Sequence, residues 1–476
     1  MFFNSFIFFV FLALVLPVFY LLRGQKPRAV WLLLASYVFY GYWDWRFCSL
    51  LLISTVVDFL VGGAIARSAS ERRRKRLLWV SCVVNLGILG FFKYFNFFVD
   101  SIQATAASLG LSVDFLHLNI ILPVGISFYT FQTMSYTIDI YRRKLEATDS
   151  LVDFALFVSF FPQLVAGPIE RARNLLPQIA VLGRPSRQQV AEGLVLLTVG
   201  YFKKVLVGDA CGRIVDHVFG QHELYRSPEL LAALILFSIQ IYADFSGYSN
   251  IARGLAKLLG IELMKNFEQP YLAANITEFW RRWHISLSSW LRDYLYISLG
   301  GNRRGARRTY LNLMTTMLLG GLWHGAAWTF VVWGGLHGLY LAVHKMTLGE
   351  RRIADRFHYH GPASLAGWLV RVLATNLLVL LTWLFFRAVD FGQAWDFLQS
   401  FAHWQGSELS GRFLGIVLSF GFMIVLLDAL EYFTGSHVWL LRLRPAATAG
   451  ICTAAMVVVL LYMATVEPMP FVYFQF

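Results

Sequence analysis

The sequence predicts an all-α polytopic integral membrane protein, and three observations carry this prediction. Hydrophobic residues make up 57% of the 476 residues and charged residues only 14%, against about 25% charged in ordinary soluble domains. Apolar runs of about 20 residues, the length that crosses a bilayer as a helix, recur along the chain. The net charge of +13 gathers in short basic segments between these runs, as in cytoplasmic membrane loops.

The apolar runs predict about 11–13 membrane segments, some of them re-entrant or interfacial. They cover residues 4–22, 29–43, 47–66, 77–99, 119–140, 151–166, 193–207, 230–248, 309–345, 366–387, 413–433 and 447–466. The run 309–345 is long enough for two spans, or for one span and a re-entrant segment. Glycine and proline interrupt several runs, and such breaks are tolerated at membrane depth only inside protein or beside a cavity.

No linker, low-complexity tract or internal repeat divides the chain. We therefore predict a single transmembrane domain over residues 1–476, with residues 467–476 as an extracytoplasmic C-terminal aromatic tail. The first run lacks the basic start of a signal peptide and is expected to be a retained span. The basic loops 67–76 and 442–444 are expected in the cytoplasm, which places both termini on the periplasmic side.

Several classes of function find no support in the sequence. The basic residues lie in loops between apolar runs, so nucleic acid is not an expected partner. The four cysteines are far apart and show no metal-ligand spacing, so no disulfide, zinc or other metal site is expected. There is no P-loop, no G-x-G-x-x-G after a strand and no G-x-S-x-G elbow. We expect no permanently bound cofactor.

The segment 265–308 is too polar and basic for a lipid-facing span. Asn275 and Glu278 have the spacing of a capping box, which predicts a helix start. One face of that helix would carry Trp280, His284, Leu287 and Leu291. We expect an interfacial or re-entrant helix at the cytoplasmic side.

His324 lies in the apolar run LLGGLWHGAAW (318–328). An ionisable residue at membrane depth is a functional candidate, because it is costly there without a partner. Burial favours the neutral imidazole, which a general base needs. Alternatively, His324 only donates to a neighbouring helix and holds the bundle together. Glycines at 320, 321 and 325 leave room for a substrate or for another backbone.

His284 is the second candidate, as an orienting group or an oxyanion donor beside His324, or as a structural interface residue. Their spacing does not show whether they meet. Gln240, Tyr242 and Asp244 in SIQIYADFSGYSN (238–250) are candidates for lining the same cavity. Asp244 could instead be the N-cap of a helix beginning near Ser246. His337 and His344 are expected to be structural.

Several long blocks resemble the membrane-bound O-acyltransferases of bacterial cell envelopes. They are RRWHISLSSWLRDYLYISLGGN (281–302), LLGGLWHGAAWTFVVWGGLHG (318–338), ILPVGISFYTFQTMSYTIDIYR (121–142), FFPQLVAGPIER (160–171) and YADFSGYSNIARGLA (242–256). The resemblance implies a helical bundle around a central tunnel and funnel, and acyl transfer from a thioester to a hydroxyl. It matches the catalytic histidine of the family to His324 and a second polar position to His284.

The resemblance also implies a biological role. Acetyl groups would pass from a cytoplasmic thioester across the inner membrane for O-acetylation of an exopolysaccharide. The expected donor is acetyl-CoA or another acyl thioester, and the expected polymer is alginate. The expected partners are periplasmic serine-dependent acetyltransferases. D-alanyl transfer to teichoic acid and acetylation of cellulose or peptidoglycan are alternatives. Outside the enzyme class, the alternatives are a lipid or acyl transporter and a scaffold for envelope assembly.

The chain ends in FVYFQF, where Phe471, Tyr473 and Phe476 form F-x-Y-x-x-F. A similar motif ends a small membrane partner of the teichoic-acid D-alanylation pathway. This resemblance implies an acyl relay, in which Tyr473 takes the acetyl group and passes it on at the outer face. Alternatively, the aromatic residues only anchor the chain at the membrane interface.

Overall fold

The computed structural model describes residues 1–476 except 112, 114–115, 166, 349–356, 358 and 475–476. Within the described residues every regular element is a helix, which confirms the all-α prediction. Six helical stretches there are long and apolar enough to cross a membrane: Gln25–Arg67, Glu71–Ser108, Ser227–Leu258, Pro362–Arg387, Ser410–Thr434 and Pro445–Thr465. Shorter apolar helices cover Phe6–Leu21 and Leu151–Leu164. These stretches agree with a polytopic membrane protein, and the number of crossings stays a prediction.

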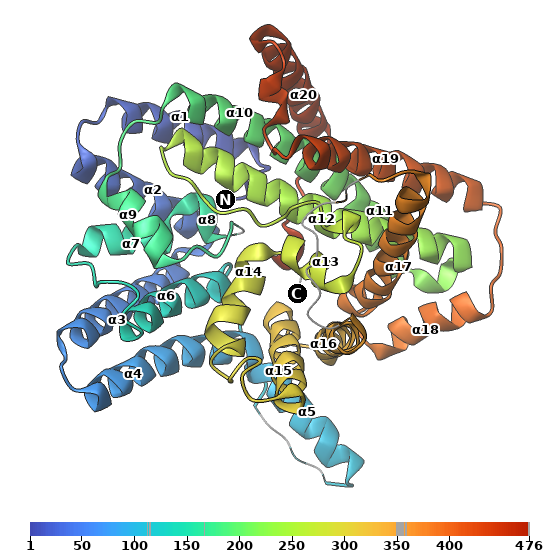
Figure 1. Cartoon of the computed structure of the whole chain (residues 1–476), viewed down its shortest axis with the longest axis horizontal. Helices are drawn as coiled ribbons and strands as arrows, with labels where there is room; N and C mark the ends of the chain where they lie inside the picture. The colour runs from blue at the N-terminus through green and yellow to red at the C-terminus, as the bar shows by residue number, and fades with distance from the viewer. Residues whose placement is uncertain (112, 114–115, 166, 349–356, 358, 475–476) are drawn as a thin grey trace. The chain divides into compact units, whose positions relative to one another are not determined.

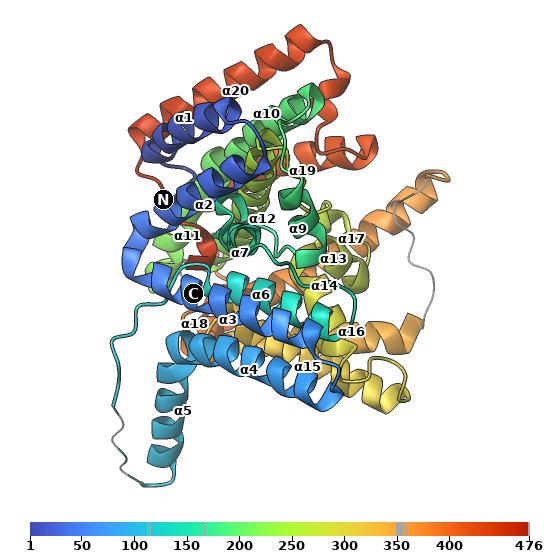
Figure 2. The same cartoon turned by 90° about the vertical axis from the view of Figure 1, so that its left-hand side faces the viewer.

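The chain forms two compact units, residues 1–194 with 252–264, and residues 195–251 with 265–476. The single-domain organisation stays a prediction. In the first unit α3, α4 and α6 lie side by side, as Figure 2 shows. Its helices are α1 (Phe6–Leu21), α2 (Gln25–Asp44), α3 (Cys48–Arg67), α4 (Glu71–Leu89), α5 (Phe95–Ser108), α6 (Ile126–Tyr141), α7 (Leu151–Ser159), α8 (Phe161–Leu164) and α9 (Ala172–Ala180).

Buried polar side chains join α3, α4 and α6. Asp58 of α3 accepts hydrogen bonds from Ser81 Oγ at 2.6 Å and Asn85 Nδ2 at 2.8 Å. Such bonds offset the cost of burying a carboxyl group between apolar helices. The predicted run 119–140 becomes helical only at Ile126, because Gly125 before it has a left-handed φ of 77°.

The second unit contains every candidate site residue. α10 (Arg187–Tyr201) leads into it from the first unit. Its other elements include the π-helical segments η3 (Phe202–Gly208) and η6 (Leu291–Tyr296), α11 (Asp209–Gly220), α12 (Ser227–Leu258) up to residue 251, α13 (Ile276–Arg282), α14 (Ile285–Trp290), α15 (Ala306–His324), α16 (Trp328–Leu348), α17 (Pro362–Arg387), α18 (Phe391–Ala402), α19 (Ser410–Thr434), α20 (Pro445–Thr465) and the short turn η8 (Val472–Phe474). In α12, 83% of the most apolar window is buried, against 11% in α19 and in α20. α12 is therefore an inner helix, whereas α19 and α20 expose apolar surface.

The long run 309–345 forms two helices, α15 and α16, which pack along each other (Figure 1). A Cβ on Gly321 would lie 2.2 Å from the carbonyl oxygen of Phe330, and one on Gly325 would lie 2.0 Å from the Phe330 ring. Both contacts are too short for any side chain. The sequence left open whether glycines here make room for a substrate or for another part of the protein. Gly321 and Gly325 make room for Phe330 of α16.

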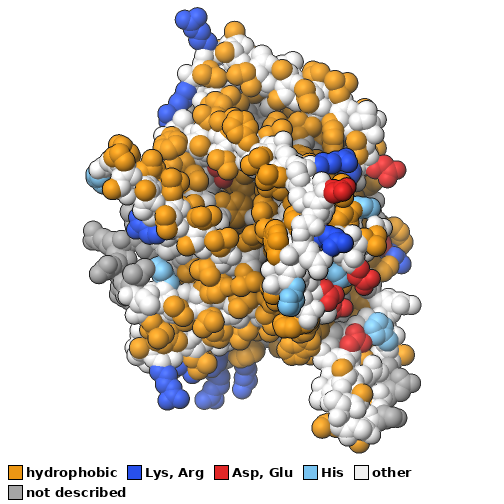
Figure 3. Space-filling view, turned by 90° about the vertical axis from the view of Figure 1, so that its right-hand side faces the viewer, with side chains coloured by type: hydrophobic (Ala, Val, Ile, Leu, Met, Phe, Trp, Pro, Cys, Tyr) orange, Lys and Arg blue, Asp and Glu red, His pale blue; other side chains and the backbone are white. Residues whose placement is uncertain are grey.

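The surface of the protein suits a lipid environment. On the face shown in Figure 3, hydrophobic side chains cover much of the surface, whereas lysine and arginine side chains lie at its upper and lower edges and, together with acidic side chains, in its right-hand part. Large apolar residues of α19, such as Leu414, Leu418 and Phe422, are exposed. A soluble monomer rarely exposes apolar patches of this kind, whereas a membrane helix presents them to lipid.

Candidate active site

The helix predicted around His284 is two helices. α13 begins as predicted, because Asn275 Oδ1 accepts a hydrogen bond from Glu278 N at 2.8 Å. It ends two residues before His284, and α14 begins one residue after it. The prediction of one continuous apolar stripe through His284 is therefore wrong. The physical reason is the backbone of His284, whose φ of 43° and ψ of 54° lie in the left-handed region.

The backbone of His284 determines the chemistry of its ring. His284 is the N-cap of α14, and its Nδ1 accepts a hydrogen bond from Leu287 N at 3.3 Å. Burial lowers the pKa of His284 to about 3, so the ring is neutral near pH 7. A neutral ring that accepts at Nδ1 carries its proton on Nε2. His284 Nε2 is therefore a hydrogen-bond donor, as an oxyanion-stabilising group must be.

His324 is the last residue of α15 and only 3% exposed. Its ring packs edge-on against Trp323 and Trp333, each 5.0 Å away between centroids. The ring of His284 lies 6.3 Å from that of His324. The two histidines, whose proximity the sequence could not show, lie in one buried aromatic cluster.

The C-terminal tail brings Tyr473 to both histidines. The centroid of its ring lies 5.3 Å from that of His324 and 6.5 Å from that of His284. Phe245 of α12 packs on the same ring at 4.8 Å. The hydroxyl oxygen of Tyr473 is buried and has no hydrogen-bond partner among the described residues. Phe476, the last residue of the predicted tail motif, lies outside them.

The setting of Tyr473 makes its hydroxyl a weaker acid than a free phenol. Burial raises the pKa of Tyr473 well above 10, and Tyr271 and Asp244 add to the shift. The hydroxyl group is therefore protonated at rest, and it needs a base in contact before it can act as a nucleophile.

Asp244 contacts the tail. The N-cap alternative for this residue is wrong, because α12 is continuous from Ser227 and Asp244 lies in its interior. Its Oδ1 pairs with Lys204 Nζ at 2.7 Å, and its Oδ2 accepts a hydrogen bond from Val472 N at 2.7 Å. The carboxylate thus joins α12 to the backbone beside Tyr473.

Gln240 and Tyr242 have different surroundings from Asp244. Tyr242 donates to Asp428 Oδ1 at 2.8 Å. Gln240 is 3% exposed and lies beside Gly212 of α11. Tyr242 and Gln240 are both buried, but within the described residues these contacts lie with Asp428 and Gly212 and not with the histidines. Of the three candidates for lining a shared cavity, Asp244 is the one that hydrogen-bonds to the tail, at the residue before Tyr473.

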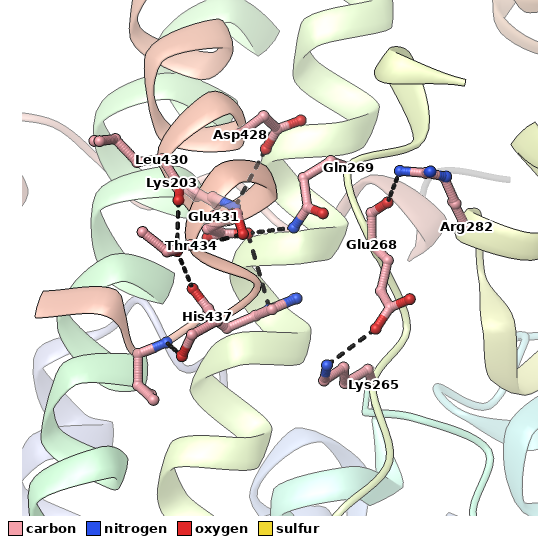
Figure 4. A network of polar contacts seen from close by, with 12 residues as sticks. Lys203, Lys265, Glu268, Gln269, Arg282, Asp428, Leu430, Glu431, Thr434 and His437 are labelled. Atoms are coloured by element: carbon pink, nitrogen blue, oxygen red, sulfur yellow. Dashed lines mark hydrogen bonds and ion pairs between the residues drawn. The ribbon is translucent and has the colours of Figure 1, made fainter. Parts of the chain in front are cut away.

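A buried ion-pair cluster surrounds Lys203, as Figure 4 shows. Lys203 Nζ lies 3.2 Å from Glu431 Oε1 and 3.8 Å from Asp428 Oδ1. Gln269 Nε2 donates to Glu431 Oε2 at 2.9 Å. The sequence reasoning missed Lys203, Lys204, Asp428 and Glu431. The available signal was charged residues inside the apolar runs 193–207 and 413–433, because such residues are expensive at membrane depth.

A cavity of about 610 Å³ lies among α13, α14, η6, α15 and α16. Arg281, Arg292 and Lys345 supply positive charge to its wall, beside apolar side chains such as Trp280 and Met317. The wall also includes Ile285, the residue after His284. The arrangement suits a ligand with both anionic and apolar parts. In the described part of the chain, no three His, Cys, Asp or Glu side chains are grouped to hold a metal ion.

The histidines that were expected to be structural differ from each other. His337 is fully buried between Trp280, whose Nε1 donates to its Nδ1 at 3.3 Å, and Thr382 Oγ1 at 3.0 Å from its Nε2. These bonds agree with a structural role. His344 lies in the wall of the 610 Å³ cavity, where its Nδ1 is 2.9 Å from Thr277 Oγ1.

Comparison with known proteins supports the resemblance seen in the sequence. Residues 110–385 match the membrane-bound O-acyltransferase family. The probable alginate O-acetylase of Pseudomonas aeruginosa is 45% identical over 408 residues, 84% of this chain and 76% of that protein. The peptidoglycan O-acetyltransferase of Helicobacter pylori is 36% identical over 406 residues, 80% of this chain and 75% of that protein.

A more distant relative is the teichoic acid D-alanyltransferase of Streptococcus thermophilus. It is 25% identical over 249 residues, 49% of this chain and 59% of that protein. The family match covers more than half of the chain and agrees with the apolar helices described above. This chain is therefore a membrane O-acyltransferase and belongs to the membrane-bound O-acyltransferase family.

Proposed function

We propose that the protein takes acetyl groups from a cytoplasmic thioester and passes them across the inner membrane for O-acetylation of an exopolysaccharide, with alginate as the polymer. The relatives with 42–45% identity, all named probable alginate O-acetylase, support the choice of polymer. One observation supports the chemistry above all others. A tyrosine whose hydroxyl oxygen is buried has its ring packed against two imidazoles, and one of these imidazoles is a hydrogen-bond donor.

In the proposed reaction His324 is the general base. It takes the proton of the Tyr473 hydroxyl, and the phenolate oxygen attacks the carbonyl carbon of the thioester. His284 donates from Nε2 to the oxyanion that forms. The C–S bond then breaks, and the leaving thiolate takes the proton back from His324. The products are acetyl-Tyr473 and a free thiol, with no net uptake or release of protons.

The 610 Å³ cavity supports a thioester of coenzyme A as donor. Arg281, Arg292 and Lys345 would pair with phosphate groups, and the apolar wall would take the pantetheine arm. The donor is a substrate, and no resident cofactor is part of the proposal. Burial of the two imidazoles and of the Tyr473 hydroxyl oxygen would keep water from hydrolysing the thioester.

The second half of the proposed pathway lies outside this chain. The ester of a phenol is more reactive than that of an aliphatic alcohol, so acetyl-Tyr473 can transfer its acetyl group to the serine hydroxyl of a periplasmic acetyltransferase. That partner would then modify the polysaccharide. The proposal places both termini of the chain on the periplasmic side, as the basic loops predict.

A second candidate is acetylation of peptidoglycan, which the Helicobacter pylori relative favours. The likeness to teichoic acid D-alanyltransferases covers half of the chain and gives D-alanyl transfer less support. A transporter or scaffold without bond chemistry would tolerate His324→Ala with a modest loss of flux, whereas the proposed relay would not.

The test is acetylation of the polymer in cells whose only copy of the protein carries Tyr473→Phe. This substitution keeps the aromatic ring and removes the nucleophile, so we expect polymer acetylation to disappear. Tyr42→Phe is the matched control, because Tyr42 lies in α2 of the first unit and is 59% exposed. Full acetylation with Tyr473→Phe would rule out the relay.

A further inference from the structure

We propose that Lys204, Asp209 and Asp244 form a clasp that binds the backbone of residues 470–472 and thereby sets the register in which Tyr473 faces the histidines. The clasp is an inference about how the tail is held. Its consequence for acyl transfer rests on the proposed function, whereas the holding of the tail does not.

The clasp is a buried charge cluster centred on Lys204. Lys204 Nζ lies 2.6 Å from Asp209 Oδ1 and 2.7 Å from Asp244 Oδ1, and its side chain is fully buried. The cluster has one cation and two carboxylates, so it can attract a further hydrogen-bond donor. Gly208 and Gly247 allow the elements to meet here, because a Cβ on either would lie about 3 Å or less from backbone atoms at Asp244 or Lys204.

The clasp touches the tail through backbone atoms. Asp244 Oδ2 accepts from Val472 N at 2.7 Å, and Lys204 Nζ donates to the carbonyl of Pro470 at 3.4 Å. The residue between them, Phe471, is fully buried, and its ring packs on Tyr248 at 4.7 Å. The backbone is thus held on both sides of an aromatic anchor.

The tail sequence suits such a site. Pro468 and Pro470 have no backbone N–H group, so a buried tail has fewer donors to satisfy. Arg213 holds the start of the tail through the carbonyl of Glu467 at 2.5 Å. Charged side chains of the bundle therefore contact the backbone of the tail at residues 467, 470 and 472.

The register matters because of the geometry of the turn that holds Tyr473. Tyr473 lies in η8, a 3-10 turn in which each residue rotates the chain by about 120° and advances it by about 2.0 Å. A slip of one residue would therefore point the ring of Tyr473 to another side, away from the histidines. The bond from Val472 N to Asp244, one residue before Tyr473, is the contact that most directly prevents this slip.

The test uses a matched pair at one position of the full-length protein. Val472→Pro removes the backbone N–H group, and proline fits the backbone because Val472 opens the turn η8. Val472→Ala keeps the N–H group and loses only side-chain contacts. The first readout is the rate at which a carboxypeptidase removes the tail through Phe474, followed by mass spectrometry; the bond cut last then has Tyr473, and not residue 472, on its amino side.

We expect the tail of Val472→Pro to be removed ~10- to 100-fold faster than that of Val472→Ala, because a buried bond to a charged acceptor is lost. Asp244→Asn should release the tail similarly, and combining it with Val472→Pro should add little. Equal protection of Val472→Pro and Val472→Ala would overturn the clasp, and this comparison needs no folded Asp244 variant.

The second readout tests the consequence for chemistry. At saturating labelled acetyl-CoA, Val472→Pro should label Tyr473 at least ~10-fold more slowly than Val472→Ala, with the same half-saturating acetyl-CoA concentration. Equal labelling despite a released tail would overturn the positioning role. If Tyr473 is never labelled, even in the wild type, the relay fails, while the protease comparison still decides whether the clasp exists.

Discussion

Replacement of His284 separates its structural role from its chemical one. The residue caps α14 through Nδ1 and adopts a φ of 43°. His284→Asn keeps both features, because asparagine tolerates the left-handed region and its Oδ1 can cap Leu287 N. Its amide also retains a hydrogen-bond donor. His284→Ala keeps neither the cap nor the donor.

The expected magnitudes of the two roles differ. Loss of the N-cap costs about 1 kcal/mol of folding free energy, which leaves a protein stable by about 5–15 kcal/mol folded. Loss of an oxyanion donor costs about 100- to 1,000-fold in rate, or about 2.7–4 kcal/mol. We therefore expect His284→Ala to transfer acetyl at least ~100-fold more slowly than the wild type, and His284→Asn to stay within about tenfold of it.

The assay is transfer of labelled acetyl from acetyl-CoA to the polymer in membranes that contain the partner proteins. The amount of folded protein is checked by size-exclusion chromatography in detergent. The reasoning about the donor would be refuted if folded His284→Ala transferred acetyl as fast as His284→Asn.

Three further predictions follow from the described contacts. Gly321→Ala should lower the free energy of unfolding by ~1–3 kcal/mol in a thermal melt, because its Cβ would meet a carbonyl oxygen at 2.2 Å. The control Gly415→Ala has open space around it and should be neutral or slightly stabilising. Lys203→Met should lower the free energy of unfolding by ~3–5 kcal/mol, because it removes the cation between the buried carboxylates of Asp428 and Glu431. The control Lys265→Met should lower it by less than ~1 kcal/mol in the same thermal melt, since Lys265 is 42% exposed. The free energy of unfolding should fall by up to ~1.4 kcal/mol per pH unit as the pH drops from 6.5 toward 3, because His284 takes up a proton in the unfolded chain before it does so in the folded one. If folded His284→Asn lost stability with falling pH as steeply as the wild type, this prediction would be wrong.

The sequence predicted those features that depend on local composition. The charge deficit and the length of the apolar runs identified a helical membrane protein, and the Asn275–Glu278 spacing predicted where α13 begins. The run 309–345 forms two helices that pack closely at Gly321, and composition alone does not show this packing. Whether both helices cross the membrane, or one is re-entrant, stays a prediction.

The backbone break at His284 had no local signal. A left-handed backbone is uncommon for any residue other than glycine, so a continuous helical stripe was the natural expectation. The contact of Tyr473 with His324 joins residues that local rules cannot relate. The charged partners of Asp244 and Tyr242 were visible as polar residues in apolar runs, but their pairing needed the fold.

The central claim is that Tyr473 receives the acyl group with His324 as its base. The direct measurement is the mass of the C-terminal peptide after the purified protein is given isotopically labelled acetyl-CoA, with His324→Ala in parallel and a repeat in membranes that contain the partner proteins. The account predicts a labelled acetyl group on Tyr473 in the wild type and none in His324→Ala. Label on Tyr473 in both proteins, or polymer acetylation in those membranes without labelled Tyr473, would contradict it.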